Sequence, residues 1–467
     1  MKKIILIILI SFGLAQNTRY IDEIFENVVK TEDVVYGNAP DLPFWFWVEW
    51  NTYDIDLTMD VYEPEGDTLT NRPVILFFHA GAFFSGHNEV DDIVTLSIAS
   101  AKRGYVAISV TYRLGLNVLS SYSGERAVYR GVQDASAAIR YLKEFHEDFK
   151  IDPDNIFIWG TSAGSFIGLH LSYMEEEDRP ASTYGGGLDP DLGCIDCEGN
   201  NYNHESRPKA LVSCWGAIGD TEYIDETDSV PAILFHGTAD PIVPFNSGFP
   251  FTIDIALPIV YGSNLIHDRF NELGISHEFY AEDGLLHEYW GSINGNWVGG
   301  PNEYFEQIKS NGYLFLYEQL DGVETITIEN MENWNLVGLP LDVENSFYFT
   351  LFPEAIEGTL YSYNGGYVSE TILNTGNGYW LRFSNEGSTT LNGTPINELT
   401  ITLNQGWNMI GSISSPVNVS AILDEENILI PGTVYGFDGG YFEAGTMEPG
   451  KGYWVRANNS GSITIQN

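Results

Sequence analysis

The chain has 467 residues, of which 43% are hydrophobic and 14% aromatic, and its 65 acidic side chains outnumber 21 basic ones to give a net charge of −44. This apolar content excludes an intrinsically disordered chain and predicts two or three domains. The acidic excess excludes nucleic acid as a partner, because binding a polyanion requires a basic surface, and it is typical of an acidic surface in a salty or extracellular setting.

The first residues have the pattern of a secretory signal peptide. Lys2 and Lys3 precede a short apolar run that ends in small residues at Gly13 and Ala15. The run is too short to span a bilayer, and Gln16 follows it in place of the cysteine that a lipoprotein anchor requires. We therefore expect removal of residues 1–15, a secreted or periplasmic location, and no membrane span.

From about residue 34 to residue 319, apolar segments of strand length alternate with helical patterns. The apolar segments are residues 73–78, 105–110, 156–159, 210–215 and 232–235, and the helical patterns include 127–149 and 162–174. Strands that are apolar throughout are buried on both faces, so the pattern predicts an α/β domain with a mostly parallel sheet and helices on both sides. Residues 51–62 alternate polar and apolar side chains, which predicts an antiparallel strand with one wet face.

A Gly-x-Ser-x-Gly motif occupies residues 160–164, between the predicted strand 156–159 and a predicted helix. In a sharp turn from strand to helix, the small glycines allow the serine to adopt a strained conformation above the sheet. Ser162 is therefore the predicted nucleophile. The next backbone N–H, from Ala163, lies at a helix N-terminus, where it can bind an oxyanion.

A serine hydroxyl needs a base for its proton and donors for the developing charge. Upstream, Gly81 and Ala82 follow the strand 73–78, and their N–H groups are expected to face the reacting carbonyl oxygen. Downstream, Asp240 follows the strand 232–235, and His287 follows a further predicted strand, 278–281. The predicted triad is therefore Ser162, Asp240 and His287, in the chain order of α/β-hydrolases.

Other residues compete for the roles of base and acid. Among the histidines, we expect structural roles for His79 and His236, which lie at strand ends. We expect a helical position for His170 and surface positions for His267 and His277. Asp220 is the alternative acid, because a well-placed carboxylate at another strand end would orient the imidazole equally well.

These segments together resemble the α/β-hydrolase superfamily, and within it the carboxylesterase and hormone-sensitive-lipase-like branch. The sequence His79-Ala-Gly-Ala82 stands where that branch usually has His-Gly-Gly-Gly, and Tyr112-Arg-Leu114, Gln133-Asp134 and residues 151–156 are similar to its other recurring segments. The segment around Asp240 looks more like those of secreted feruloyl esterases and polyester depolymerases. The resemblance covers about residues 55–300 and implies an α/β-hydrolase fold that needs no metal or organic cofactor.

Residues 175–209 form an insertion that we expect to overhang the site and shape selectivity. Within it, Cys194 and Cys197 lie in a loop rich in Gly, Asp and Asn, and a local disulfide is the favoured interpretation. A zinc site would need four ligands, and besides the two cysteines only His204 lies nearby in the sequence. A redox dithiol would need the two cysteines at the start of a helix, which this loop does not offer. No loop has the ligand pattern of a calcium site. Candidate apolar walls of the substrate pocket are Phe83, Phe84 and Trp290, each of which is equally suited to a core.

After residue 319 the chain becomes rich in Gly, Asn and Thr and repeats itself. The motifs around Trp334, residues 360–367 and Trp380 recur 73 or 74 residues later, around Trp407, residues 434–441 and Trp454. Two β repeats, about residues 325–393 and 398–467, are therefore predicted to form one pseudo-symmetric β domain. Their tryptophans favour core positions, with a sugar- or polymer-stacking platform as the alternative.

The sequence therefore predicts a signal peptide (1–15), an α/β-hydrolase domain (16–320) and a β domain (321–467). The predicted function is a secreted serine hydrolase of carboxylic esters, with a small or polymeric ester as its substrate. A polymer-directed variant would act on plant-wall esters or polyesters, with the repeats contacting polymer or cell surface. A serine peptidase on the same fold and a non-catalytic adhesion protein are further alternatives.

Overall fold

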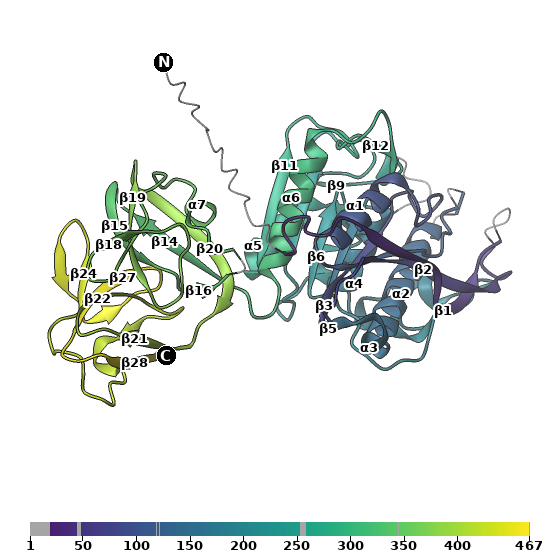
Figure 1. Cartoon of the computed structure of the whole chain (residues 1–467). Coiled ribbons are helices and arrows are strands. Elements are labelled where there is room, and N and C mark those ends of the chain that lie inside the picture. The colour runs from purple at the N-terminus through teal and green to yellow at the C-terminus, as the bar shows by residue number, and fades with distance from the viewer. Residues whose placement is uncertain are drawn as a thin grey trace, which may run out of the picture. The chain divides into compact units, whose positions relative to one another are not determined.

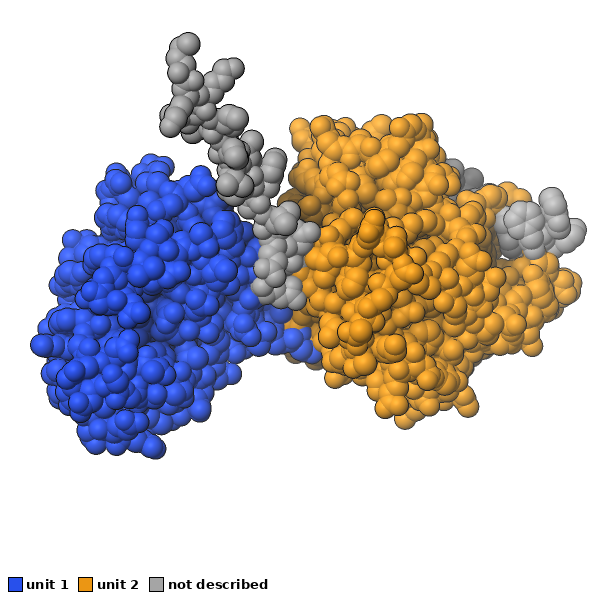
Figure 2. Space-filling view, in the orientation of Figure 1, with its two compact units in different colours: residues 1–18, 321–467 blue, residues 19–320 orange. Residues whose placement is uncertain are grey.

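The computed structural model describes residues 19–466 except 44–47, 118, 121, 253–257 and 344. The predicted signal peptide, residues 1–15, lies outside the described residues. The chain forms two compact units, which divide between residues 320 and 321 (Figure 1, Figure 2). In chain order, residues 19–320 (orange in Figure 2) are called the first unit and residues 321–467 (blue in Figure 2) the second unit, and each is described by itself.

The first unit is built around an eight-stranded sheet of order β1-β2-β4-β3-β5-β6-β8-β11. Its strands are β1 (Val28–Asp41), β2 (Tyr53–Pro64), β3 (Arg72–Phe78), β4 (Val106–Val110), β5 (Ile151–Thr161), β6 (Ala210–Cys214), β8 (Ala232–Gly237) and β11 (His277–Glu282). Strand β2 pairs antiparallel with β1 and β4, and the other neighbours pair parallel. The predicted mostly parallel sheet and its antiparallel opening strand are both confirmed.

Helices cover both faces of this sheet, as its strands, buried on both sides, require. The helices are α1 (Asp91–Lys102), α2 (Ser123–Glu144), α3 (His146–Phe149), α4 (Ala163–Tyr173), α5 (Ser263–Leu273) and α6 (Glu303–Glu318). On one face, Tyr313 of α6 hydrogen-bonds Ser100 of α1 at 2.7 Å and lies against the ring of Trp159 in β5. On the other face, the next side chain of β5, Ile158, packs against Gly168 of α4.

Short strands in the loops of the first unit form two small sheets. Their bounds are β7 (Ala217–Ile218), β9 (Ser247–Gly248) and β10 (Val260–Gly262) in one, and β12 (Ser292–Ile293) and β13 (Asn296–Trp297) in the other. Both follow the carboxyl ends of parallel strands, the edge at which α/β sheets hold their functional loops.

The described part of the second unit contains antiparallel strands, one short α-helix, α7 (Tyr348–Leu351), and a 3₁₀ turn at Val419–Ala421. Its first half contains β14 (Glu324–Asn330), β15 (Asn333–Gly338), β16 (Leu341–Asp342), β17 (Tyr361–Tyr363), β18 (Tyr367–Ser369), β19 (Gly378–Phe383) and β20 (Gly387–Pro395). Its second half contains β21 (Glu398–Leu403), β22 (Gly406–Gly411), β23 (Val417–Asn418), β24 (Tyr435–Phe437), β25 (Tyr441–Glu443), β26 (Thr446–Met447), β27 (Gly452–Ala457) and β28 (Gly461–Gln466). The four-stranded sheets of the two halves, β15-β19-β17-β18 and β22-β27-β24-β25, have the same strand order.

Each half of the second unit has its own hydrophobic core, and one further cluster takes side chains from both halves. Trp380 and Trp454 belong to this shared cluster and are each 9% exposed. Trp334 and Trp407, the second residues of β15 and β22, are 39% and 40% exposed. The predicted core role is thus correct for the first pair of tryptophans and wrong for the second pair.

Candidate active site

Ser162 occupies a sharp turn between β5 and α4. Its backbone has φ 50° and ψ −112°, a conformation that costs energy for any residue with a side chain. Its neighbours are crowded: a Cβ atom on Gly160 would lie 2.3 Å from the Gly164 carbonyl oxygen, and one on Gly164 would lie 2.0 Å from the Phe78 carbonyl oxygen. The Gly-x-Ser-x-Gly motif is therefore a steric requirement of this turn.

The three residues of the predicted triad form one hydrogen-bonded chain. His287 Nε2 lies 2.9 Å from Ser162 Oγ, and His287 Nδ1 lies 2.6 Å from Asp240 Oδ2. Asp240 follows β8 and His287 follows β11, and the parallel pairing of these strands brings both loops to the edge where Ser162 lies. This arrangement allows the imidazole to take a proton from the serine while the carboxylate fixes its tautomer.

Asp240 is held as a carboxylate inside the protein. Its side chain is fully buried, and Oδ1 accepts hydrogen bonds from the N–H groups of Ile242 at 2.7 Å and Val243 at 3.0 Å. Burial by itself raises the pKa of Asp240, but hydrogen bonds from His236 and His287 outweigh it and hold this pKa well below its usual range. The negative charge beside His287 is therefore present at neutral pH. His236 thus supports the loop, as expected.

Two of the three predicted oxyanion donors border the same cavity as the serine. Ala163 is the first residue of α4, so its N–H has no carbonyl one turn earlier to bind. Ala82 has φ 56° in the turn after β3 and lines the cavity with Ala163. Gly81 does not line the cavity; it serves the turn, where its carbonyl accepts the N–H of Ser85 at 3.0 Å.

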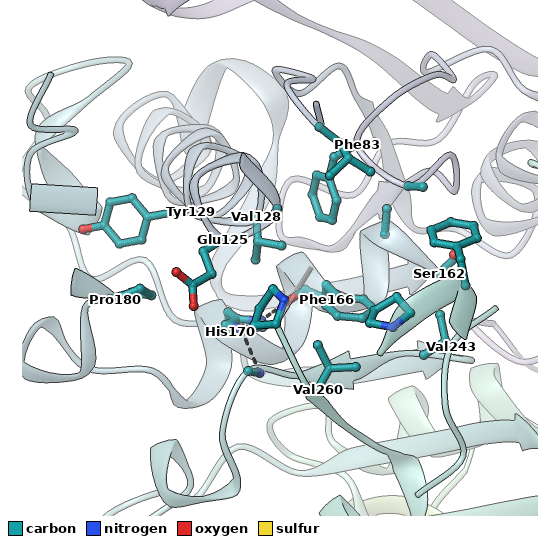
Figure 3. A pocket seen from close by; sticks show the side chains of 18 of the residues that line it. Phe83, Glu125, Val128, Tyr129, Ser162, Phe166, His170, Pro180, Val243 and Val260 are labelled. Atoms are coloured by element: carbon teal, nitrogen blue, oxygen red, sulfur yellow. Dashed lines mark hydrogen bonds between the residues drawn. The ribbon is translucent and has the colours of Figure 1, made fainter. Parts of the chain in front are cut away.

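A cavity of about 870 Å³, its open mouth included, extends from Ser162 (Figure 3). Its walls are mostly apolar and include Leu116, Val128, Phe166, Met174, Val243 and Val260. The cavity therefore suits an apolar part of a substrate whose reacting carbonyl lies at the serine.

The far end of the cavity carries polar side chains that the sequence analysis had not assigned to a cavity wall. Figure 3 shows Glu125, Tyr129 and His170 at the end away from Ser162. His170 lies eight residues after the serine, a rise of about 12 Å along a helix. Burial lowers the pKa of His170 to about 4, and its Nε2 accepts the N–H of Gly219 at 3.1 Å. This imidazole is therefore a neutral wall group.

A signal for this wall was present in the sequence. Ser162, Phe166, His170 and Met174 are spaced by four residues and all line the cavity. In a helix such residues share one face, so the position of the serine alone predicts the next three.

The three predicted wall residues have different positions. Phe83 lines the cavity. Phe84 is 44% exposed and lies outside the lining. Trp290 is fully buried, with its ring 4.7 Å from Trp215 and 5.3 Å from Phe305, so the prediction that it lines the pocket is wrong. Trp290 therefore belongs to an aromatic cluster in the core.

Two buried carboxyl groups support the loop that carries His287. Glu288 Oε2 and Asp92 Oδ2 lie 3.2 Å and 3.5 Å from the hydroxyl of Ser292. Burial raises the pKa of Asp92 well above its usual range, and the nearby Glu288 raises it further. Burial also raises the pKa of Glu288, with His287 opposing the shift. No sequence pattern connects Asp92 with Ser292, which lies 200 residues further along the chain.

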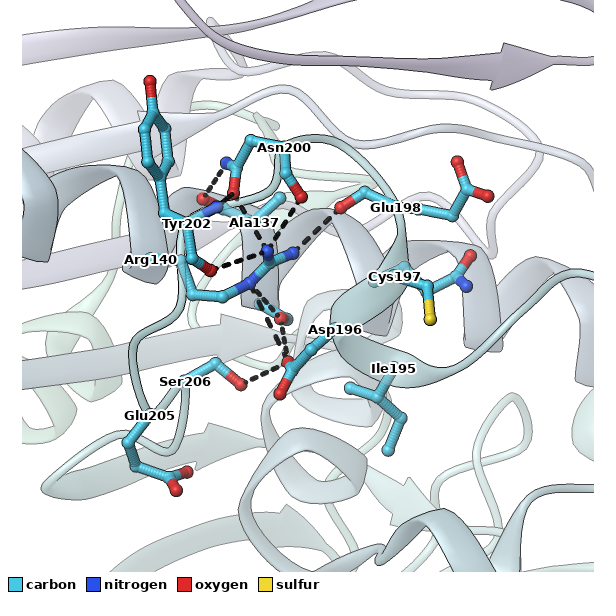
Figure 4. A network of polar contacts seen from close by, with 12 residues as sticks. Ala137, Arg140, Ile195, Asp196, Cys197, Glu198, Asn200, Tyr202, Glu205 and Ser206 are labelled. Atoms are coloured by element: carbon cyan, nitrogen blue, oxygen red, sulfur yellow. Dashed lines mark hydrogen bonds and ion pairs between the residues drawn. The ribbon is translucent and has the colours of Figure 1, made fainter.

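The insertion at 175–209 is fixed to the body of the unit by polar contacts (Figure 4). Arg140 of α2 donates to the carbonyl and side-chain oxygens of Asn200, both at 2.9 Å, and the Asn200 amide donates to a backbone carbonyl of β1. The predicted disulfide between Cys194 and Cys197 is formed. The insertion reaches the cavity lining at Pro180, so its first part borders the site and its disulfide loop does not.

The residues considered as rivals have other partners. Asp220 caps the following turn by accepting the N–H of Glu222 at 3.1 Å. His79 Nδ1 lies 2.6 Å from the carbonyl oxygen of Ala80, in keeping with a structural role. His267 and His277 hydrogen-bond each other at 2.7 Å and are each partly exposed, so they lie at the surface only in part.

Neither a metal cluster nor a membrane-spanning helix is found in the described part of the chain. Within it, no three His, Cys, Asp or Glu side chains are arranged to hold a metal ion. His204, the extra ligand considered for zinc, lies 2.8 Å from Glu144. The described helices are also too short or too polar to cross a bilayer.

Comparison with known proteins was made by family, by sequence and by structure. Residues 59–218 match the family model BD-FAE, a segment that includes Ser162 and ends before Asp240 and His287. The chain is 31% identical over 111 residues to para-nitrobenzyl esterase of Bacillus subtilis and, over the same length, to gut esterase 1 of Caenorhabditis briggsae. It is 30% identical over 162 residues to the neuroligin-like protein glit-1 of Caenorhabditis elegans.

These matches are partial. They cover 23%, 23% and 33% of this chain and 22%, 19% and 21% of the three relatives, so the chain spans about a fifth of the length of each. Among solved structures, Thermogutta terrifontis esterase 2 phosphonylated by cyclosarin is 21% identical, with a TM-score of 0.41 over 56% of this chain and 89% of that one. The strand order, together with the matched segment, gives the unit of residues 19–320 an α/β-hydrolase fold.

Proposed function

We propose that the protein is a serine hydrolase of carboxylic esters. The hydrogen-bonded chain from Ser162 Oγ through His287 to Asp240 carries this proposal. The position of the serine at a strained turn beside an apolar cavity, and the family match around it, support it further.

The reaction proceeds in two halves. His287 takes the proton of Ser162 as the serine oxygen attacks the ester carbonyl, and the backbone N–H groups of Ala82 and Ala163 stabilise the oxyanion. The tetrahedral intermediate collapses, and His287 gives the proton to the departing alcohol, which leaves an acyl-enzyme. Water then loses a proton to His287 and attacks the acyl carbon, and His287 returns this proton to Ser162 Oγ as the acyl–oxygen bond breaks and the acid leaves.

The charge of the chain suits this cycle. The substrate is a neutral ester, which a net charge of −44 does not repel, and the product is a carboxylate, which the same charge tends to expel. We also propose export of the protein, supported by the signal-peptide pattern of residues 1–15.

A panel of substrates tests the proposal. p-Nitrophenyl esters of two to eight carbons and matched p-nitroanilides are supplied to the wild-type protein and to Ser162→Ala. We expect turnover of esters by the wild type, little of amides, and a loss of about 10⁴-fold or more in the variant. Equal ester turnover by both proteins would refute the proposal, and a preference for anilides would favour the peptidase alternative.

A polymer-directed esterase is the second candidate. The observation that favours it is the exposed aromatic surface of the second unit, at Trp334 and Trp407 among others. Replacing both tryptophans with alanine should leave turnover of soluble esters unchanged and lower turnover of the same ester on an insoluble polymer. An equal effect on both substrates would contradict it.

A further inference from the structure

The second unit presents aromatic side chains that the esterase mechanism does not use. Trp334 and Trp407 are 39% and 40% exposed, and Tyr367 and Tyr441 are 60% and 59% exposed. Exposed aromatic residues that gather in a hollow, in contrast to scattered ones, mark a surface that binds something.

These side chains line two clefts, of about 780 and 910 Å³ with their open sides included. The first cleft is lined by Trp334, Tyr361, Tyr367, Trp380 and Phe437. The second cleft is lined by Tyr363, Tyr367, Trp407, Tyr435, Tyr441 and Trp454. Because Tyr367 lines both, the two clefts form one continuous aromatic groove.

The two clefts are built in the same way, and each half of the unit completes the other's. Phe437 of the second half stands 4.8 Å from the ring of Trp380 in the first cleft. Tyr363 of the first half stands 4.8 Å from the ring of Trp454 in the second cleft. The two contributing strands, β17 and β24, occupy corresponding positions in the two halves, so the groove contains the same arrangement of aromatic rings twice.

The floor of the groove is rigid. Trp380 and Trp454 are each only 9% exposed and pack with Leu336 and Met409 in the cluster shared by both halves. The exposed rings stand on this floor at steep angles: Trp334 meets Trp380 at 85° and Trp407 meets Trp454 at 89°. Rings held in this way lose little conformational entropy when a ligand binds.

The charges around the groove limit the ligand. The second unit, residues 321–467, has 17 acidic and three basic residues, which disfavours a polyanion. The residues that line the clefts carry no carboxylate, so a cationic ligand would find no ion-pair partner among them. The fitting ligand is therefore uncharged, extended, and repetitive enough to use both clefts.

Hydrogen-bonding groups lie at the edges of the groove. Arg382 and Arg456, two of the three basic residues in the unit, are exposed and are the cross-strand partners of Trp334 and Trp407. Tyrosine side chains combine an apolar ring with a hydroxyl that both donates and accepts. Sugar rings match this combination, because they have apolar C–H faces that stack on aromatic rings and a rim of hydroxyl groups.

We propose that the groove of the second unit binds an uncharged polysaccharide chain, with sugar rings stacked at both clefts. The inference rests on the proposed function in one respect: an esterase whose ester is attached to a glycan gains a high local substrate concentration when the same chain is held nearby. Binding itself requires no turnover, so it is tested independently of catalysis.

The test is affinity electrophoresis of the full-length Ser162→Ala protein in gels that contain arabinoxylan, mixed-linkage β-glucan or galactomannan. We expect retardation by at least one of them. Trp334→Ala and Trp407→Ala, added singly, should each weaken binding by roughly a hundredfold or more, because each removes one of two linked sites, and the double change should abolish it. Phe349→Ala, an exposed aromatic outside the groove and 37% exposed, should bind as before.

Folding of each variant is checked by its thermal transition, and Tyr441→Ala replaces Trp407→Ala if the tryptophan variant is unfolded. Absence of retardation by all three glycans would overturn the proposal, as would retardation that the groove variants do not change. Binding of a proline-rich or trimethyl-lysine peptide to the groove in place of the glycans would also overturn it. In each of these cases ester turnover by the wild type remains, which separates this failure from failure of the proposed function.

Discussion

The substitution Asp240→Asn changes one atom in the chain of hydrogen bonds behind the serine. The amide oxygen would keep the position of Oδ1, because two N–H groups, from Ile242 and Val243, point at it. The amide nitrogen would then face His287 Nδ1, now 2.6 Å from a carboxylate oxygen. Because that nitrogen is a donor, His287 would have to place its proton on Nε2, where it could not accept one from Ser162.

The expected loss is large. A triad carboxylate changed to an amide with its geometry intact costs about 10⁴-fold in kcat, which corresponds to about 5 kcal/mol of transition-state stabilisation. The assay is kcat and KM for p-nitrophenyl acetate at pH 7.5, with circular dichroism to confirm the fold. KM should change little, because Asp240 does not line the cavity.

Asp220→Asn is the matched control. Asp220 caps a turn by accepting the N–H of Glu222, and asparagine caps as well as aspartate. Its kcat should stay within about twofold of the wild type, a bound that follows from the intact cap. The reasoning would be refuted if folded Asp240→Asn kept more than about a tenth of the wild-type kcat, where about 10⁻⁴ is expected, or if Asp220→Asn showed the large loss.

Three further predictions concern the cavity, the disulfide and a buried acid. Val128→Phe, which narrows the cavity, should lower kcat/KM for p-nitrophenyl octanoate at least about tenfold relative to the acetate, whereas Trp290→Phe should lower the melting temperature without changing this preference; the reverse pattern would contradict the assigned walls. Replacing Cys194 and Cys197 with serine should destabilise the protein by about 2 kcal/mol, the loop-entropy value for so short a loop, and leave kcat on small esters unchanged; a loss of kcat would place the loop at the site. Burial and a neighbouring carboxylate raise the pKa of Asp92, so folding favours its protonated form, and the wild type loses stability as pH rises from the unfolded pKa towards the raised pKa of the folded protein. Asp92→Asn should therefore gain melting temperature relative to the wild type between pH 4 and pH 8, and parallel curves would contradict this.

Much of the fold could be predicted from local pattern. Apolar runs such as 73–78 and 232–235 became β3 and β8, because a strand buried on both faces leaves no polar positions in its sequence. The antiparallel strand β2 could be predicted for the opposite reason, because its side chains alternate between polar and apolar. The exposure of the aromatic residues in the second unit was harder to predict, because Trp and Tyr on a strand have the same sequence pattern whether or not another part of the chain covers them.

The residues of the candidate site likewise include some that local pattern predicts and others that depend on distant segments. Ser162 could be found because its turn imposes glycines on both sides, and Asp240 and His287 because parallel strands end at one edge. The misassignment of Trp290 has a physical cause: residues after a catalytic histidine can point to the site or behind it, and the aromatic neighbours that decide this come from distant segments. Glu125 was missed because its helix, α2, carries no motif that marks a cavity wall.

The most direct measurement is covalent trapping of the nucleophile. The wild-type protein is treated with a fluorophosphonate, digested and analysed by mass spectrometry. The triad geometry predicts one phosphonyl adduct, on the peptide that contains Ser162, with loss of esterase activity in proportion to labelling and no adduct in Ser162→Ala. An adduct on another serine, or full labelling with activity retained, would contradict the assignment of Ser162 as the nucleophile.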